Sequence, residues 1–121
     1  MNYYTHSMGG KIHCLRNSSG PVDKQGKYIT NIFTGEVSKL LVNSTKPQFT
    51  YLAYNAPHLP ISAPDWIKNK LRGEYRKMGH QNVQEYQLEF DGAVRVVDYG
   101  IKKLYEQAKT LDRETIFIFT R

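Results

Sequence analysis

The sequence predicts an α/β fold, a partial doubly wound, mostly parallel sheet with flanking helices. Residues 49–54 and 115–120 are short apolar segments rich in β-branched and aromatic residues, a composition typical of strands buried on both faces. Residues 83–109 between them repeat apolar side chains every three or four positions, which predicts a long amphipathic helix. A helix that joins two strands forms a right-handed crossover, so we expect the strands to be parallel.

The remaining elements follow along the chain. Residues 1–28 are expected to form an irregular loop, because glycines and a proline interrupt every regular period. Residues 29–42 are expected to form a short helix with Thr34 as its N-cap. After the first strand, prolines predict an extended segment with one short turn, followed by a charged surface loop at 71–82. The predicted order over 29–121 is therefore helix, strand, loop, helix and strand.

Two features concern how these elements pack. Gly92 and Gly100 lie inside the long helix, where each costs up to about 1 kcal/mol relative to alanine, so we expect close packing at both positions. Strands that are buried on both faces need other elements packed against each face, and the few predicted helices cannot bury all of the apolar surface of two such strands. The 121 residues suffice for one small domain, but we expect them to be an internal part of a larger one.

The composition is basic, with 17 Lys and Arg against 11 Asp and Glu and a net charge of +6. This balance fits an anionic partner such as nucleic acid, an anionic membrane surface, or a sulfated or phosphorylated glycan. The basic residues are scattered rather than arranged in a stripe with stacking aromatics, so we do not expect nucleic-acid binding. No apolar stretch approaches the roughly 18 residues of a membrane span, so none is expected.

Several features bear on secretion. Cys14 is the only cysteine, so no internal disulfide is possible. N-glycosylation sequons begin at Asn17 and Asn43, both in polar stretches that we expect at the surface. The first residues lack the apolar region of a signal peptide. If the parent protein is secreted, we expect its leader to lie outside these residues.

His58 is the candidate site residue. Pro57 cannot donate to a ladder and ends the first predicted strand, so His58 is expected just past the carboxyl end of that strand. Ligands bind at this edge in open α/β sheets. From position alone, a loop histidine without function remains the alternative. Lys11 and His13, after two glycines, could bind an oxyanion, with incidental surface charges as the alternative.

Five segments of the chain are, in order, Asn2-Tyr3-Tyr4-Thr5-His6, Tyr28-Ile29-Thr30-Asn31-Ile32-Phe33-Thr34, FTYLAYNAPHLPISAPDW, Phe90-Asp91-Gly92-Ala93-Val94 with Val97-Asp98, and TIFIFT. Together, and in this order, they resemble the sulfatase family. The first two are similar to its arylsulfatase B branch, the N-acetylgalactosamine-4-sulfatases and the related arylsulfatases I and J. The third resembles a buried strand with its histidine loop, the fourth the long helix, and the last the strand that leads into Asp-Asn-Gly.

The resemblance implies a calcium-dependent sulfuric ester hydrolase of the alkaline-phosphatase superfamily, lysosomal or secreted, acting on a sulfated glycan or aryl sulfate ester. Family members use a formylglycine made from the cysteine of Cys-x-Pro-x-Arg, and aspartates and an asparagine hold the calcium ion. None of these maps onto this chain, so we assign no metal ligand here. His58 does map, as a catalytic and substrate-binding residue that hydrogen-bonds sulfate or protonates the departing sugar alkoxide.

The chain also departs from the family pattern. Cys14 is followed by Leu15, Arg16 and Asn17 rather than by the motif's proline and arginine, so it is not the formylglycine precursor. It is more similar to a disulfide cysteine whose partner lies elsewhere. The likeness of GGKIH to the family's Gly-Lys-x-His segment is coincidental, because the order along the chain is reversed. Arg121 stands where the Asp-Asn pair should begin.

Three hypotheses follow. The first is an internal fragment of one sulfatase catalytic domain, arylsulfatase B-like, which lacks the nucleophile and most metal ligands. The second is a non-catalytic sulfatase-like remnant that binds sulfated glycans. The third is a small basic module unrelated to sulfatases, with Lys68, Lys70 and Arg72 as its anion site.

Overall fold

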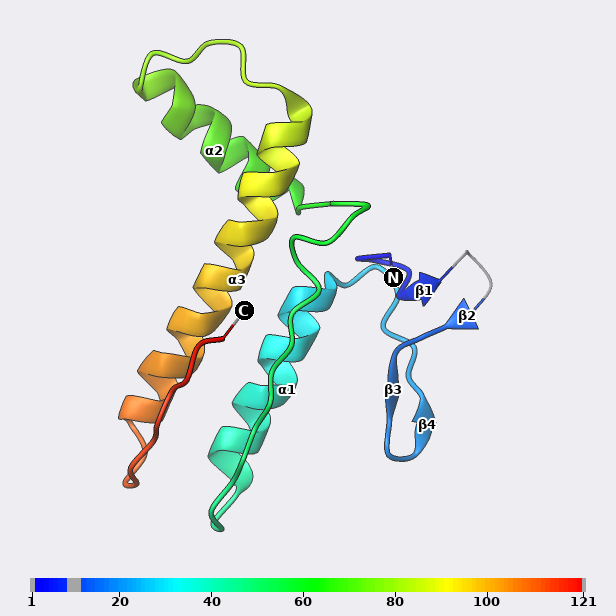
Figure 1. Cartoon of the computed structure of the whole chain (residues 1–121), viewed down its shortest axis with the longest axis vertical. Coiled ribbons are helices and arrows are strands. Elements are labelled where there is room, and N and C mark those ends of the chain that lie inside the picture. Colours follow the sequence, from blue (N-terminus) through cyan, green and yellow to red (C-terminus); the bar gives the residue numbers. More distant parts are fainter. Residues whose placement is uncertain (1, 9–11, 121) are drawn as a thin grey trace.

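The computed structural model describes residues 2–8 and 12–120, and its regular structure is mainly helical (Figure 1). The helices are α1 (Ile29–Asn43), α2 (Asp65–Lys77) and α3 (Glu85–Lys109). The long helix α3 packs against both others. Figure 1 shows α1 and α3 side by side and running in the same direction, while α2 folds back over the beginning of α3. None of the three described helices has the length and hydrophobicity needed to cross a bilayer.

The strands are short and antiparallel. β1 (Ser7–Met8) pairs with β2 (Ile12–His13), and β3 (Arg16–Asn17) pairs with β4 (Gly20–Pro21). The stretch that we expected to be irregular therefore contains two small ladders. These are the only ladders in the described part of the chain, so the predicted parallel sheet is not present.

The two predicted strands are extended segments without a ladder. Residues 49–54 lie along α1 and residues 115–120 lie along α3, and the two segments run in the same direction (Figure 1). Their composition favours extended backbone, but a ladder also requires a neighbouring strand, and neither segment has one among the described residues. The Phe117 ring contacts that of Tyr105 on α3, with centroids 5.6 Å apart. The opposite face of each segment is exposed, so the predicted burial on both faces is also wrong.

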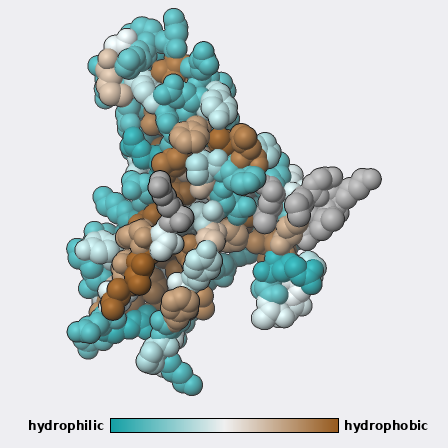
Figure 2. Space-filling view, viewed as in Figure 1, coloured by the Kyte–Doolittle hydropathy of each residue, from teal (hydrophilic) through white to brown (hydrophobic). Residues whose placement is uncertain are grey.

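This exposure leaves an apolar surface. Figure 2 shows hydrophobic surface over the lower part of the molecule, where the two extended segments lie along α1 and α3. The apolar residues of these segments with most of their surface exposed are Phe49 (93%), Tyr51 (80%), Ile116 (86%), Ile118 (79%) and Phe119 (70%). We call this set the open face.

Helix α1 begins at Ile29, and the predicted N-cap at Thr34 is wrong. The N–H of Ile29 donates to the carbonyl of Tyr3 (2.9 Å), so the N-terminal segment, rather than a capping side chain, satisfies the start of the helix. The Thr34 hydroxyl instead donates to the carbonyl of Thr30 (2.9 Å) and lies 2.8 Å from the hydroxyl of Tyr54. Thr34 therefore anchors the first extended segment to α1.

Helix α2 replaces the predicted turn and most of the predicted surface loop. Ile67 and Leu71 are spaced by four residues and are 0% and 4% exposed, respectively. Both belong to the core, with Leu88, Ala93 and Val96 of α3. Packing of this narrow apolar stripe outweighs the helix-breaking tendency of Gly73 and the many charged residues.

A buried lysine ties α2 to α3. The Lys68 ammonium lies 2.7 Å from Glu89, 3.0 Å from Glu85 and 3.2 Å from Asp65. Burial opposes the charge of Lys68, but hydrogen bonds to these carboxylates outweigh it and raise the pKa above its ordinary value. Glu89 also accepts the backbone N–H of Ala63, so it links α3 to the segment before α2.

The two glycines of α3 allow close packing, as predicted. A Cβ on Gly92 would lie 2.8 Å from the Cβ of Ala63. A Cβ on Gly100 would lie 2.6 Å from the Thr34 hydroxyl and 2.8 Å from the Tyr54 hydroxyl. Gly100 therefore marks the point where α1, α3 and the first extended segment meet.

Gly100→Ala should destabilise the chain by about 1–3 kcal/mol, because the new methyl group overpacks the Thr34–Tyr54 contact. The matched control is Gly73→Ala on α2, where a Cβ meets nothing within 4 Å. This control should stabilise the helix by roughly 0.5–1 kcal/mol. Urea unfolding followed by far-ultraviolet circular dichroism measures both. Equal effects of the two substitutions would contradict this account of the packing.

The open face should cause self-association, because unpaired extended backbone with apolar side chains pairs readily with another copy. The double substitution Ile116→Lys and Ile118→Lys should reduce the sedimentation coefficient to that of a monomer without loss of helical signal. Leu40→Lys on α1, at an exposed apolar residue outside the open face, is the control and should leave the association unchanged. An unsubstituted chain that stays monomeric at high concentration would contradict the expectation.

Candidate functional site

The candidate residue His58 lies in a loop that follows the first extended segment. Its backbone N–H donates to the carbonyl of Asn55 (2.8 Å), which closes a tight turn. The peptide bonds before Pro57 and Pro60 are both cis. The imidazole is exposed. His58 thus follows an extended segment as predicted, although that segment is not a strand of a sheet.

Two buried tyrosines from the N-terminal part of the chain hold this loop. The Tyr3 hydroxyl donates to the carbonyl of His58 (3.1 Å) and also reaches that of Asn55 (3.4 Å). The Tyr28 hydroxyl donates to the carbonyl of Ser62 (2.7 Å). The two rings stack with centroids 5.3 Å apart and planes 15° from parallel. Burial raises the pKa of both tyrosines, so their hydroxyls remain protonated donors.

The imidazole of His58 has one engaged and one available nitrogen. Nδ1 lies 2.6 Å from the carbonyl oxygen of Leu59. A carbonyl only accepts, so Nδ1 carries a proton in this contact. Nε2 has no hydrogen-bond partner among the described residues. It can therefore accept a hydrogen bond in the neutral ring or donate one from the imidazolium.

The two sequon asparagines are exposed. Asn17 lies in β3, and its side-chain oxygen accepts the N–H of Ser19 (2.9 Å). Asn43 is the last residue of α1. Glycosylation at either position remains a prediction.

Three other residues considered in the sequence lie in the N-terminal part of the chain. Cys14 is half-buried, and its N–H donates to the carbonyl of His6 (2.9 Å). Lys11 lies outside the described residues, and His13 lies in β2.

The described residues do not fit a calcium ion. Residues 2–8 and 12–120 contain no group of three or more His, Cys, Asp or Glu side chains arranged to hold a metal. The carboxylates that do converge, Asp65, Glu85 and Glu89, surround the Lys68 ammonium. The Lys68 ammonium already lies between these carboxylates, where a metal ion would have to bind. We therefore assign no metal-dependent catalytic step to the residues of this chain.

Sequence reasoning missed the tyrosine support. Tyr3 and Tyr28 entered only as parts of family-like segments, within a stretch expected to be irregular. Their aromatic character among polar residues was the one available signal, since an aromatic residue in a loop is usually buried against something. Their hydroxyl partners lie 52 to 55 residues away for Tyr3 and 34 for Tyr28, a separation that no local pattern encodes.

Tyr3→Phe should loosen the His58 loop while it keeps the ring stack, because only the hydroxyl donor is lost. Amide hydrogen exchange at His58 should accelerate, and the free energy of unfolding should fall by about 0.5–1.5 kcal/mol. Tyr4→Phe is the matched control, because the Tyr4 ring also contacts Tyr28 but its hydroxyl has no partner among the described residues. Equal exchange rates in the two variants would show that Tyr3 does not position the loop.

Comparison with known proteins places the chain in a family. The family model described as Sulfatase matches residues 2–120. An uncharacterized sulfatase, YdeN of Escherichia coli (strain K12), is 37% identical over 79 residues, which cover 62% of this chain and 12% of that protein. No solved structure matches. The family match excludes the hypothesis of an unrelated basic module, and the chain belongs to the sulfatase family.

Proposed function

We propose that these residues supply the substrate-facing histidine loop of a sulfuric ester hydrolase. The observation that carries the proposal is the state of His58: an exposed imidazole with Nδ1 fixed by Leu59, Nε2 available, and a backbone held by Tyr3. Family membership supports sulfate ester chemistry. We further propose an arylsulfatase B-like specificity, for a sulfated glycan or an aryl sulfate ester, on the resemblance of the N-terminal segments.

His58 would act through Nε2. In the imidazolium, Nε2–H donates to a sulfate oxygen of the bound ester or transfers its proton to the departing alkoxide. Protonation assists departure because an alkoxide is a poor leaving group. Nδ1–H remains bonded to the carbonyl of Leu59 throughout, which fixes the orientation of the ring. The carbonyl also favours a protonated Nδ1 and thus selects the tautomer that leaves Nε2 as the reacting atom.

Other parts of the active site would come from residues outside these 121. No Cys-x-Pro-x-Arg motif is present in the sequence, so the formylglycine nucleophile would be supplied elsewhere. The same holds for the ligands of the calcium ion. A lysosomal or secreted location, with glycans on Asn17 and Asn43 and a disulfide partner for Cys14, is part of this proposal.

A non-catalytic protein that binds sulfated glycans is the second candidate. It is favoured by the net charge of +6 and by the missing nucleophile motif. In that case His58 would still contact sulfate, but no ester would be cleaved.

The test uses the full-length natural protein that contains these residues, assayed with p-nitrocatechol sulfate. His58→Gln should lower kcat by about 10²–10⁴-fold, the range of lost acid–base catalysis. Lys103→Gln, which removes one exposed positive charge from α3, is the control and should leave kcat unchanged. Full activity of His58→Gln would disprove the role of His58. Binding of a chondroitin sulfate oligosaccharide without any turnover would instead support the second candidate.

A further inference from the structure

The basic residues of α2, namely Lys68, Lys70, Arg72, Arg76 and Lys77, lie in different environments. Lys68 is buried among three carboxylates and is not available to an external anion. Lys70 donates to the Tyr99 hydroxyl (2.7 Å), and its ammonium lies 5.2 Å from the centre of that ring. Arg72 and Arg76 lie one helical turn apart on the same side of α2.

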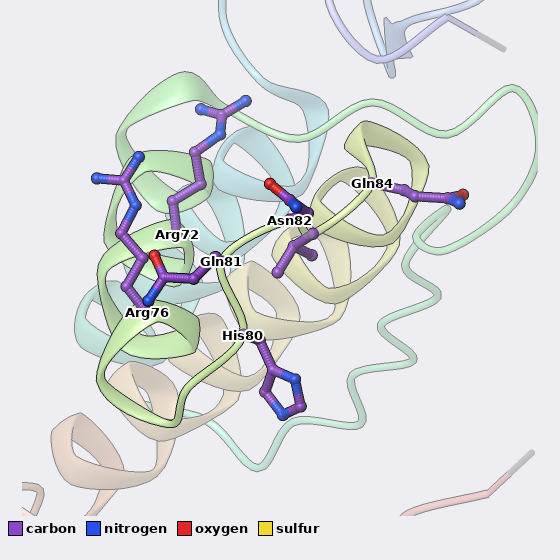
Figure 3. Close-up of a pocket in the computed structure, with 7 residues that line it drawn as sticks. Arg72, Arg76, His80, Gln81, Asn82 and Gln84 are labelled. Atoms are coloured by element: carbon purple, nitrogen blue, oxygen red, sulfur yellow. The ribbon is translucent and has the colours of Figure 1, made fainter.

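These two arginines line a pocket between α2 and the loop that leads into α3 (Figure 3). Its volume is about 390 Å³. No carboxylate lines it among the described residues. Besides Val83, the lining residues are Arg72, Arg76, His80, Gln81, Asn82 and Gln84. The pocket therefore presents two positive charges and several amide groups.

Arg72 is held in place and keeps donors to spare. Its guanidinium donates to the side-chain oxygen of Asn69 (2.8 Å) and to the carboxylate of Glu85. A guanidinium has five N–H groups, so the remaining ones are open to a ligand. Glu85 also accepts from Lys68 (3.0 Å), in a cluster where Asp65 and Glu89 share the charge of Lys68. Glu85 therefore compensates Arg72, and this arginine offers the pocket N–H donors while Arg76 supplies the net charge. Lys68 first, and then Arg72, lower the pKa of Glu85 and keep it ionised.

Arg76 is the free cation of the pocket. Within residues 2–8 and 12–120 its guanidinium has no hydrogen-bond or ion-pair partner, and the side chain is exposed. Figure 3 shows both guanidinium groups extending from α2, with the amide of Gln81 directed toward Arg76. The imidazole of His80 points away from both arginines. The lining therefore offers N–H donors from Arg72 and Arg76 and from the side-chain amides of Gln81, Asn82 and Gln84.

We propose that this pocket is a second anion site, separate from His58, that binds a sulfate or phosphate group. Guanidinium groups bind such oxyanions through paired N–H donors, and side-chain amides add neutral donors beside them. A tetrahedral oxyanion can accept from both arginines at once, which relieves the repulsion between two cations placed one turn apart. The site depends on neither ester hydrolysis nor the proposed role of His58.

The test is a titration of the full-length natural protein that contains these residues, isotope-labelled at its Arg, Gln and Asn residues, with sodium sulfate and sodium phosphate at constant ionic strength set with chloride. Saturable NMR shifts are expected at the Arg72 and Arg76 side chains and at the amides of Gln81 and Asn82. Arg76→Gln should weaken binding by about tenfold or more, as expected for lost hydrogen bonds to a charged group. Arg76→Lys should recover only part of the affinity, because an ammonium cannot form the paired contact.

Two controls separate this site from general charge effects and from His58. Lys103→Gln removes an exposed cation elsewhere and should leave the affinity unchanged. In His58→Gln, which removes an imidazole proposed to contact sulfate at a different loop, the saturable shifts measured at Arg72, Arg76, Gln81 and Asn82 should persist with the same affinity. Shifts that do not saturate, or that persist in Arg76→Gln, would overturn the proposal, as would loss of binding in His58→Gln.

A second ligand, a chondroitin sulfate oligosaccharide, tests whether the site binds a sulfate group of a glycan or a free anion. Tighter binding of the oligosaccharide than of sulfate, still dependent on Arg76, would assign the site to a sulfated glycan. Equal affinity per sulfate group would assign it to a free anion. Oligosaccharide binding that is insensitive to Arg76→Gln would overturn the site for this ligand.

Discussion

The stacked pair of Tyr3 and Tyr28 is the contact on which the arrangement of the chain depends. The backbone carbonyl of Tyr3 accepts the first N–H of α1, and its hydroxyl holds the loop of His58. Tyr28 precedes α1 and donates to the segment that leads into α2. Both rings lie in the same core as Ile67 of α2 and Leu88 of α3. One buried aromatic contact therefore fixes three parts of the chain that are distant in sequence.

Burial also decides what each cation of α2 does. Lys68 is inserted between the helices, where leaving it unpaired would be costly, and three carboxylates are committed to it. Arg76, two turns later on the exposed side, has no such partner among the described residues. Lys68 and Arg76 look equivalent in the sequence, but Lys68 stabilises the contact between α2 and α3, whereas Arg76 is available to ligands.

The sequence predicted the helix with strong periodicity and the extended segment before His58, while the role of His58 stays a prediction. Helix α3 has apolar residues repeated through 25 positions, enough to determine its type without tertiary information. Helix α2 was missed because its stripe is narrow, essentially Ile67 and Leu71 among charged residues, and only packing on α3 makes it favourable. The prediction of a parallel sheet was not confirmed for a related reason. Strand pairing depends on two neighbouring segments, whereas the composition of one segment indicates only that its own backbone is extended. The pocket lined by Arg72 and Arg76 could not be predicted from a sequence analysis that expected a loop at these residues, because the helical spacing places the two arginines on one side of α2.

The hydrogen bond from Tyr3 to His58 joins residues 55 positions apart, and this has a consequence for the order of folding. Closing so long a loop has a large entropic cost, whereas each helix forms from neighbours in sequence. Helical structure can therefore be complete before the histidine loop reaches its final position. A nick or deletion near the N-terminus would release the loop and also remove the Tyr3 ring from the core that the helices share. The shape of the candidate site is thus decided by the first residues of the chain, although its chemistry resides in the middle.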